Sequence, residues 1–211
     1  MLKKIYNKVT HEWDTSVEEA LKSFIRLPAL SPDFDKKWEE NGVLLKALED
    51  AQAWAEKQGI KGLRCEIIKD DGFTPCLFVE VDATSDKKFE RSVFFYGHLD
   101  KQPPNEGWDP DKSAWEPVIQ NGRLYGRGAV DDGYAFYTSL AAVKALQTLG
   151  IPHPRCVGLF EVFLPPLRIV FKGSRTEARR YRTGDRFGQL LRRLRQTLGD
   201  FLAQRHARGH D

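Results

Sequence analysis

The stretch Ser92–Asp100, SVFFYGHLD, decides the fold that we predict for this chain. Its four consecutive apolar residues, Val93–Tyr96, predict a strand buried on both faces, which is typical of a mostly parallel sheet. His98 and Asp100 follow at the carboxyl end of that strand, the edge where open α/β sheets bind their ligands. Residues two apart in an extended chain point the same way, so Asp100 can accept a hydrogen bond from one imidazole nitrogen. We therefore expect the other nitrogen of His98 to bind a cation.

A second segment, Gly126–Gly133 (GRGAVDDG), presents two adjacent carboxylates in a glycine-rich turn. Asp131 and Asp132 offer hard oxygen ligands, and a carboxylate can bridge two cations because it has two oxygens. Each pattern alone is weak, because a His-x-Asp pair also ends ordinary strands and carboxylates also cap helix N-termini. The combination of the two segments is what points to a metal site.

Taken in order, these motifs resemble those of the co-catalytic dizinc metallopeptidases. The likeness rests on Gly97–Pro104 (GHLDKQPP), the Trp- and Pro-rich run Trp108–Pro117, and Asn121–Asp132 (NGRLYGRGAVDD). The family includes carnosine dipeptidase, aminoacylase, acetylornithine deacetylase and succinyl-diaminopimelate desuccinylase. The likeness is closest to the dipeptidase branch and covers Ser16 to about Cys156.

The resemblance implies roles for three residues of this chain. His98 would bind one metal, Asp131 would bridge both metals, and Asp100 would be the catalytic-site residue that orients His98. It also implies two divalent cations, with zinc preferred over manganese or cobalt, a dipeptide or N-acyl amino acid substrate, and a homodimer. A Lys commonly follows the Asp pair in that family, whereas Gly133 and Tyr134 follow it here, which we interpret as a subfamily difference.

The resemblance stops at the strand predicted for Val157–Phe160. In the family this strand ends in a Glu-Glu pair, which supplies the general base and a metal ligand. Here Glu161 is followed by apolar residues and matches the position before the pair, so we do not assign it as the base. Because a catalytic zinc needs about three protein ligands, His98 and Asp131 alone predict weak metal binding. We therefore expect a truncated and inactive dipeptidase-like hydrolase.

The remaining sequence predicts an α/β fold with a mixed, mostly parallel sheet flanked by helices, as in the N-terminal part of a zinc-peptidase catalytic domain. A capping box at Ser16–Glu19 predicts the start of the first helix. The other expected elements are a helix over 44–55, a hairpin of strands near 63–67 and 77–81 with its turn at 70–72, a turn at 85–88, a helix over 134–149 and a strand over 157–160.

Composition indicates a soluble globular protein of one domain, or of one domain and a fragment. The chain has 211 residues, of which 41% are hydrophobic and 30% charged. Cys65, Cys76 and Cys156 form no Cys-x-x-Cys motif, so we expect buried free thiols. The sequence shows neither a signal peptide nor a membrane-spanning run, and we expect a cytoplasmic protein.

Charge divides the chain into two parts. Residues 1–154 carry a net charge of −5, whereas residues 155–211 carry +8. We predict a partial metallopeptidase catalytic domain over 1–161 and a basic helical tail, rich in Arg and unlike the family, over 162–211. One hypothesis is that this tail is translated out of frame from a GC-rich gene.

The tail also suggests a second function. Apolar residues between Phe187 and Gln204 form a helical stripe beside Arg192, Arg193 and Arg195. Such a basic amphipathic helix can bind a membrane surface, nucleic acid or a partner helix, although we do not expect nucleic acid as the partner. The alternative hypothesis is therefore a non-catalytic interaction protein. A third possibility is a chain that does not fold stably, because an incomplete parallel sheet leaves an open edge.

Overall fold

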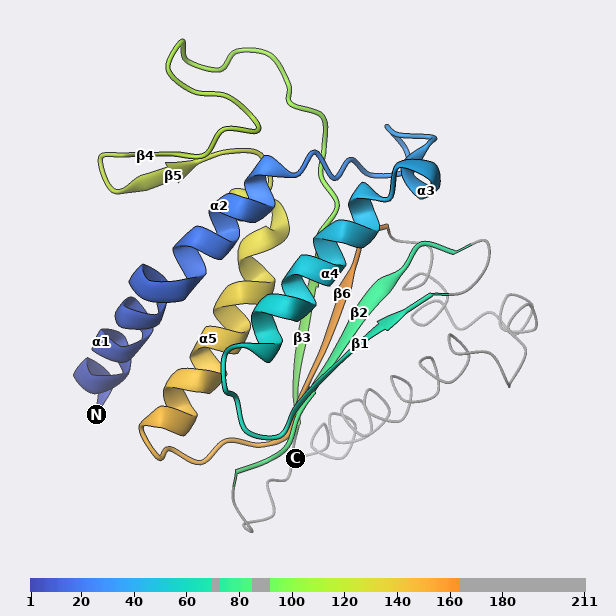
Figure 1. The fold of residues 1–211 in the computed structure, drawn as a ribbon. Coiled ribbons are helices and arrows are strands. Elements are labelled where there is room, and N and C mark those ends of the chain that lie inside the picture. Colours follow the sequence, from blue (N-terminus) through green and yellow to red (C-terminus); the bar gives the residue numbers. More distant parts are fainter. Residues whose placement is uncertain (70–72, 85–91, 164–211) are drawn as a thin grey trace, which may run out of the picture.

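The computed structural model describes residues 1–69, 73–84 and 92–163 and shows an α/β fold (Figure 1). The first part of the chain forms α1 (Leu2–Glu12), the π-helical turn η1 (Trp13–Val17), α2 (Glu18–Arg26), α3 (Trp38–Asn41), α4 (Val43–Glu56), β1 (Leu63–Ile68) and β2 (Cys76–Val81). The second part forms β3 (Val93–His98), β4 (Val118–Gln120), β5 (Arg123–Tyr125), the turn η2 (Ala129–Gly133), α5 (Tyr134–Thr148) and β6 (Cys156–Glu161). No helix of the described residues is long and apolar enough to cross a membrane.

Four strands form a mixed sheet in the order β1-β2-β6-β3. β3 and β6 pair in parallel, whereas β1 with β2 and β2 with β6 pair antiparallel. The mixed sheet with flanking helices confirms the predicted α/β fold class, but the described sheet is not mostly parallel as predicted, because only one of its three strand pairings is parallel. β4 and β5 form a separate hairpin that we did not predict from the sequence. Its turn residues Asn121 and Gly122 have φ of 53° and 73°, as a type I′ turn requires.

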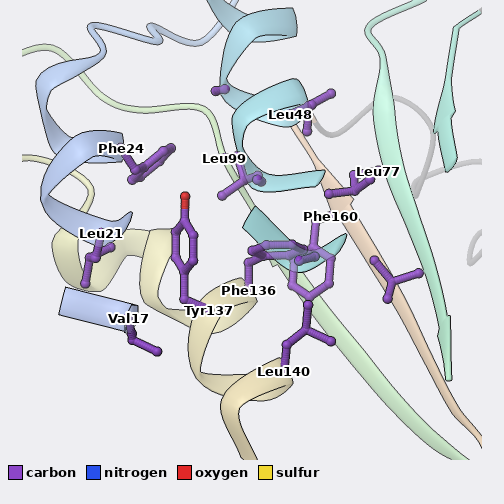
Figure 2. Close-up of a cluster of buried hydrophobic side chains, with 14 of the residues drawn as sticks. Val17, Leu21, Phe24, Leu48, Leu77, Leu99, Phe136, Tyr137, Leu140 and Phe160 are labelled. Carbon is purple, nitrogen blue, oxygen red and sulfur yellow. The ribbon is translucent and has the colours of Figure 1, made fainter. Parts of the chain in front are cut away.

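Helices α2, α4 and α5 pack together against one face of the sheet, and the main hydrophobic core lies between them and the strands (Figure 1). Aromatic rings link the layers, because Phe136 of α5 meets Phe160 of β6 edge-on with ring centroids 4.9 Å apart. Each fully buried large apolar side chain contributes about 1.5–3 kcal/mol to folding. The core residues labelled in Figure 2 are Val17, Leu21, Phe24, Leu48, Leu77, Leu99, Phe136, Tyr137, Leu140 and Phe160.

Strand β3, turn η2, helix α5 and strand β6 form a βα unit, as predicted. The first strand ends at His98, the turn carries the two aspartates, and α5 returns the chain to start the parallel strand β6. Parallel strands joined in this way place the segments that follow them at the same edge of the sheet. The candidate site is therefore built where β3 ends.

Two local predictions are wrong. Val93–Tyr96 is not buried on both faces, because β3 is the outer strand of the described sheet and Val93 and Tyr96 are each about two-fifths exposed. Ser16 caps no helix, because helical backbone already starts at Leu2 and runs through η1 into α2, so the preceding turn satisfies the N–H groups there.

Other predictions are confirmed or lie outside the described residues. The three cysteines are free thiols, with Cys76 and Cys156 buried and Cys65 partly buried. Strands β1 and β2 form the predicted antiparallel pair, but the turns at 70–72 and 85–88 are not among the described residues. Residues 164–211 are also outside them. The basic tail, its amphipathic helix and its out-of-frame origin therefore stay predictions.

Candidate metal centre

Strand β3 brings His98 to the sheet edge where its parallel neighbour β6 also ends. The register places His98 opposite Glu161, and the Leu99 N–H donates to the Glu161 carbonyl oxygen at 2.7 Å. The Leu99 side chain is fully buried in the core, which fixes the chain directly after His98. His98 and Asp100 thus lie at the carboxyl end of the strand, as predicted.

The His98 imidazole lies between two carboxylates. Its Nδ1 is 3.1 Å from Oδ1 of Asp100, and its Nε2 is 3.1 Å from Oδ1 of Asp131. The hydrogen bond and the negative charge of Asp100 raise the pKa of His98 to about 9, against the opposing effect of burial. At neutral pH both ring nitrogens then carry a proton, and each donates it to one carboxylate.

Close packing brings the aspartate turn against the end of β3. The backbone N–H of His98 donates to Oδ2 of Asp132 at 3.3 Å. A Cβ on Gly97 would lie only 2.8 Å from that same oxygen, so the approach requires glycine. In η2 the peptide bond between Asp131 and Asp132 is cis. Through its hydrogen bond with the His98 N–H, Asp132 ties the turn to β3, while Asp131 faces the imidazole of His98.

His98 and Asp131 together suit a single cation. Two atoms bound tetrahedrally to one zinc ion, each at about 2.0–2.2 Å, lie about 3.4 Å apart. The separation of 3.1 Å between His98 Nε2 and Asp131 Oδ1 is close to that value. Asp100 on Nδ1 completes the carboxylate–histidine arrangement that fixes a metal-binding ring. The described residues hold no cluster of three or more His, Cys, Asp or Glu placed for one ion.

Two charged residues at this edge received no role from the sequence: Glu161 was compared with the family's Glu-Glu pair and not assigned as the base, and Lys101 was not considered. Glu161 is only 2% exposed, and its Oε1 accepts a hydrogen bond from the Tyr96 hydroxyl. Burial raises the pKa of Glu161, and its Oε2 is buried without a hydrogen-bond partner among the described residues. Lys101 is 1% exposed. The sequence did not indicate that these two residues are buried, because charged residues are expected on the surface by default.

Two tryptophans of the long loop after Asp100 make defined contacts. The Trp115 ring packs near the Lys101 ammonium, whose Nζ is 5.4 Å from the ring centroid. Trp108 donates its indole N–H to the Pro104 carbonyl oxygen at 2.6 Å. Asp70 and Asp71, in the turn that we predicted at 70–72, lie outside the described residues.

Comparison with known families agrees with this geometry. Residues 94–162 match the sequence profile of Peptidase family M20/M25/M40. This part of the chain is therefore similar to part of an M20 peptidase domain. The matched range includes His98, Asp100 and Asp131, and it ends directly after Glu161.

Curated proteins similar to this chain include dipeptidases and a desuccinylase. The Cys-Gly metallodipeptidase dug1 of Schizosaccharomyces pombe is 36% identical over 67 residues, which is 31% of this chain and 14% of that protein. The Beta-Ala-His dipeptidase of Mus musculus is 37% identical over 78 residues, 35% of this chain and 15% of that protein. The succinyl-diaminopimelate desuccinylase of Nitratiruptor sp. is 29% identical over 131 residues, 61% of this chain and 29% of that protein.

Solved structures share the fold over most of this chain. Human carnosine dipeptidase 1 superposes with a TM-score of 0.59 at 20% identity, covering 82% of this chain and 38% of that one. The di-peptidase Dug1p of Saccharomyces cerevisiae superposes with a TM-score of 0.58, also at 20% identity, covering 85% of this chain and 37% of that one. The chain therefore spans well under half the length of the proteins to which it is similar.

Proposed function

We propose that this chain is a metal-binding, dipeptidase-like hydrolase segment whose own hydrolytic activity is negligible. His98 and Asp131 would hold a divalent cation, zinc in preference to manganese or cobalt, and Asp100 would fix the His98 ring. The observation that carries this proposal is the imidazole held between two carboxylates, with Nε2 and Asp131 Oδ1 3.1 Å apart. The matches to M20 dipeptidases support it.

The proposed substrate is a peptide or amide bond next to a free carboxylate, as in a dipeptide or N-acyl amino acid. A bound cation would supply Lewis-acid polarisation of the carbonyl and a lowered pKa for water. Asp100 would keep Nε2 of His98 turned outward by accepting the Nδ1 proton. Asp131, whose side chain is 66% exposed, would be the ligand open to solvent. We place this function in the cytoplasm, in line with the prediction from the sequence.

The carboxyl groups around His98 support the proposal of negligible hydrolysis. A general base must reach the attacking water within a hydrogen bond, about 2.6–3.2 Å. Glu161 is the carboxyl group at the end of β6, but it is buried and bonded to the Tyr96 hydroxyl. The Asp100 and Asp131 carboxylates are both engaged with His98. With Asp132 Oδ2 accepting the His98 backbone N–H at 3.3 Å, each carboxyl group at this edge of the described structure already has a hydrogen-bond partner.

Zinc titration by calorimetry tests the metal site. We expect the wild-type chain to bind one Zn²⁺ ion weakly, and Asp131→Ala to abolish binding. Asp33→Ala is the matched control, because the Asp33 side chain is 67% exposed, like the 66% of Asp131, but its ion-pair partner is Lys36 and not His98. Equal affinity for zinc in the wild-type chain and Asp131→Ala would contradict the proposal.

The activity assay tests the second half of the proposal. We expect no zinc- or manganese-dependent cleavage of Cys-Gly or β-Ala-His, the dipeptides named in the relatives' descriptions. Cleavage that is lost in Asp131→Ala would overturn the inactivity and would mean that residues outside the described part supply the base.

A further inference from the structure

Lys101, three residues after His98, is among the largest fully buried side chains of the described structure. Its Nζ donates to three main-chain carbonyl oxygens at the end of α2, those of Phe24 at 2.5 Å, Ile25 at 3.2 Å and Leu27 at 2.7 Å. The ammonium also lies 4.0 Å from the centroid of the Phe24 ring. The partners of this buried cation are thus a helix C-terminus and an aromatic face.

Such an environment suits a lysine ammonium. The last carbonyls of a helix lack intrahelical donors and form the negative end of the helix dipole. Burial alone lowers the pKa of Lys101 to about 7, whereas three accepting carbonyls favour the charged form. The contact is also held from the main chain, because the Lys101 N–H donates to the Ala29 carbonyl at 2.8 Å and the Ser31 N–H donates to the Lys101 carbonyl at 3.0 Å.

The candidate metal centre has two halves, the His98–Asp100 segment and the aspartate turn, and both meet at Lys101 and Phe24. The first half is joined through the chain itself, because Lys101 directly follows Asp100. The second half touches them at two glycines of the aspartate segment. A Cβ on Gly128 would lie 2.7 Å from the Lys101 Cε, and a Cβ on Gly133 would lie 2.3 Å from the Phe24 ring. Figure 2 shows Phe24 projecting from α2 into the same core as Leu99.

We propose that Lys101 is a positioning residue that sets the distance between His98 and Asp131 by locking the His98–Asp100 segment and the aspartate turn onto the C-terminus of α2. This role rests on the proposed function, because its purpose is metal binding. It also makes a prediction about the geometry of the site that holds without any metal.

Lys101→Met tests the role, because methionine keeps an unbranched apolar chain of similar length and removes only the ammonium. We expect zinc affinity, measured by calorimetry, to fall about 10- to 100-fold, the usual effect of removing an outer partner of a metal ligand. Val143→Ala is the control for a general loss of stability. Val143 is buried in α5, nine residues and about 13 Å along the helix from Tyr134. It should keep wild-type zinc affinity.

A second readout and a second variant keep the outcome decisive. The ring signals of His98 in NMR spectra of the metal-free chain, assigned with His98→Asn, should shift in Lys101→Met and stay in place in Val143→Ala. Gly128→Ala should shift them too, because its Cβ displaces the Lys101 stem, and it replaces Lys101→Met if that variant does not fold.

Unchanged ring signals together with unchanged zinc affinity would overturn the positioning role and leave the metal proposal standing. A wild-type chain that binds no zinc would overturn the metal proposal, while shifted ring signals would still support the positioning role.

Discussion

Strands β3 and β6 end side by side, yet the two ends place their charges in opposite environments. After β3, the imidazole of His98 lies between Asp100 and Asp131, and the Asp131 side chain is mostly exposed. At the end of β6, the carboxyl group of Glu161 is buried and bonded to the Tyr96 hydroxyl. The carboxylate of Asp131 beside the end of β3 is exposed to solvent, whereas the carboxyl group at the end of β6 is buried.

The pKa values of the two ends express this difference. Both the pKa of His98 and that of Glu161 are raised. For His98 the main cause is the hydrogen bond to Asp100, which favours the charged form. For Glu161 it is burial, which disfavours the charged form. A raised pKa therefore marks a stabilised charge at one strand end and a destabilised charge at the other.

The largest expected effect is on metal affinity at the β3 end. A cation can bind His98 Nε2 only after displacing its proton, and the pKa of His98 is raised to about 9. The dissociation constant for zinc should therefore fall about tenfold per pH unit, or about 100-fold from pH 6 to pH 8. Calorimetry at three pH values measures this slope. A slope that flattens above pH 7 would show that Asp100 does not hold the proton on the ring.

A smaller effect is expected on stability when Asp100 becomes Asn. Because the folded-state pKa of His98 is raised, its stabilising contribution is complete below the ordinary value of about 6.5 and disappears as the pH rises through about 9. Asp100→Asn should lower the free energy of unfolding by about 1.5 kcal/mol at pH 6 and by almost nothing at pH 10. A hydrogen bond to a charged group contributes about 1.5–3 kcal/mol, and we take the low end of this range because the His98 side chain is 32% exposed.

Urea unfolding at both pH values measures the effect, with Asp33→Asn as a neutral control. An equal loss at pH 6 and pH 10 would contradict a role for the His98 charge.

Much of the fold follows from the sequence because it depends on local patterns. The apolar face of α4, with Leu44, Leu48 and Ala51, is buried as its helical spacing predicts. The prediction from the capping box at Ser16 is wrong because such a pattern indicates a helix start only where no helix precedes it. Here α1 and η1 precede α2 without a break. The hairpin of β4 and β5 had a usable signal in Asn121-Gly122, which we read only as part of a motif.

In the candidate site, too, the residues that belong to local sequence patterns could be predicted, and the others could not. His98, Asp100 and Asp131 are brought together because their motifs sit at the ends of elements whose order is that of a βα unit. The burial of Lys101 and Glu161 could not be predicted in this way. Their burial depends on contacts with α2 and β3 that no short sequence pattern encodes.

The smallest expected effect is at the end of β6 and has the opposite sign to that of Asp100→Asn. Burial raises the pKa of Glu161, so folding favours its protonated form. The contribution of Glu161 to the free energy of unfolding is greatest below its ordinary pKa of about 4.5 and declines as the pH rises above that value. Glu161→Gln keeps an oxygen to accept the Tyr96 hydroxyl and cannot ionise. It should raise the free energy of unfolding by about 1 kcal/mol at pH 7.5 and change it little at pH 4.

Urea unfolding of Glu161→Gln at these two pH values, beside the exposed control Glu56→Gln, measures the difference between the strand ends. A loss of stability at pH 7.5 would mean that the ionised Glu161 carboxylate has a favourable partner in solution. The buried Oε2 of Glu161, which has no hydrogen-bond partner among the described residues, would then be the atom that such a partner contacts.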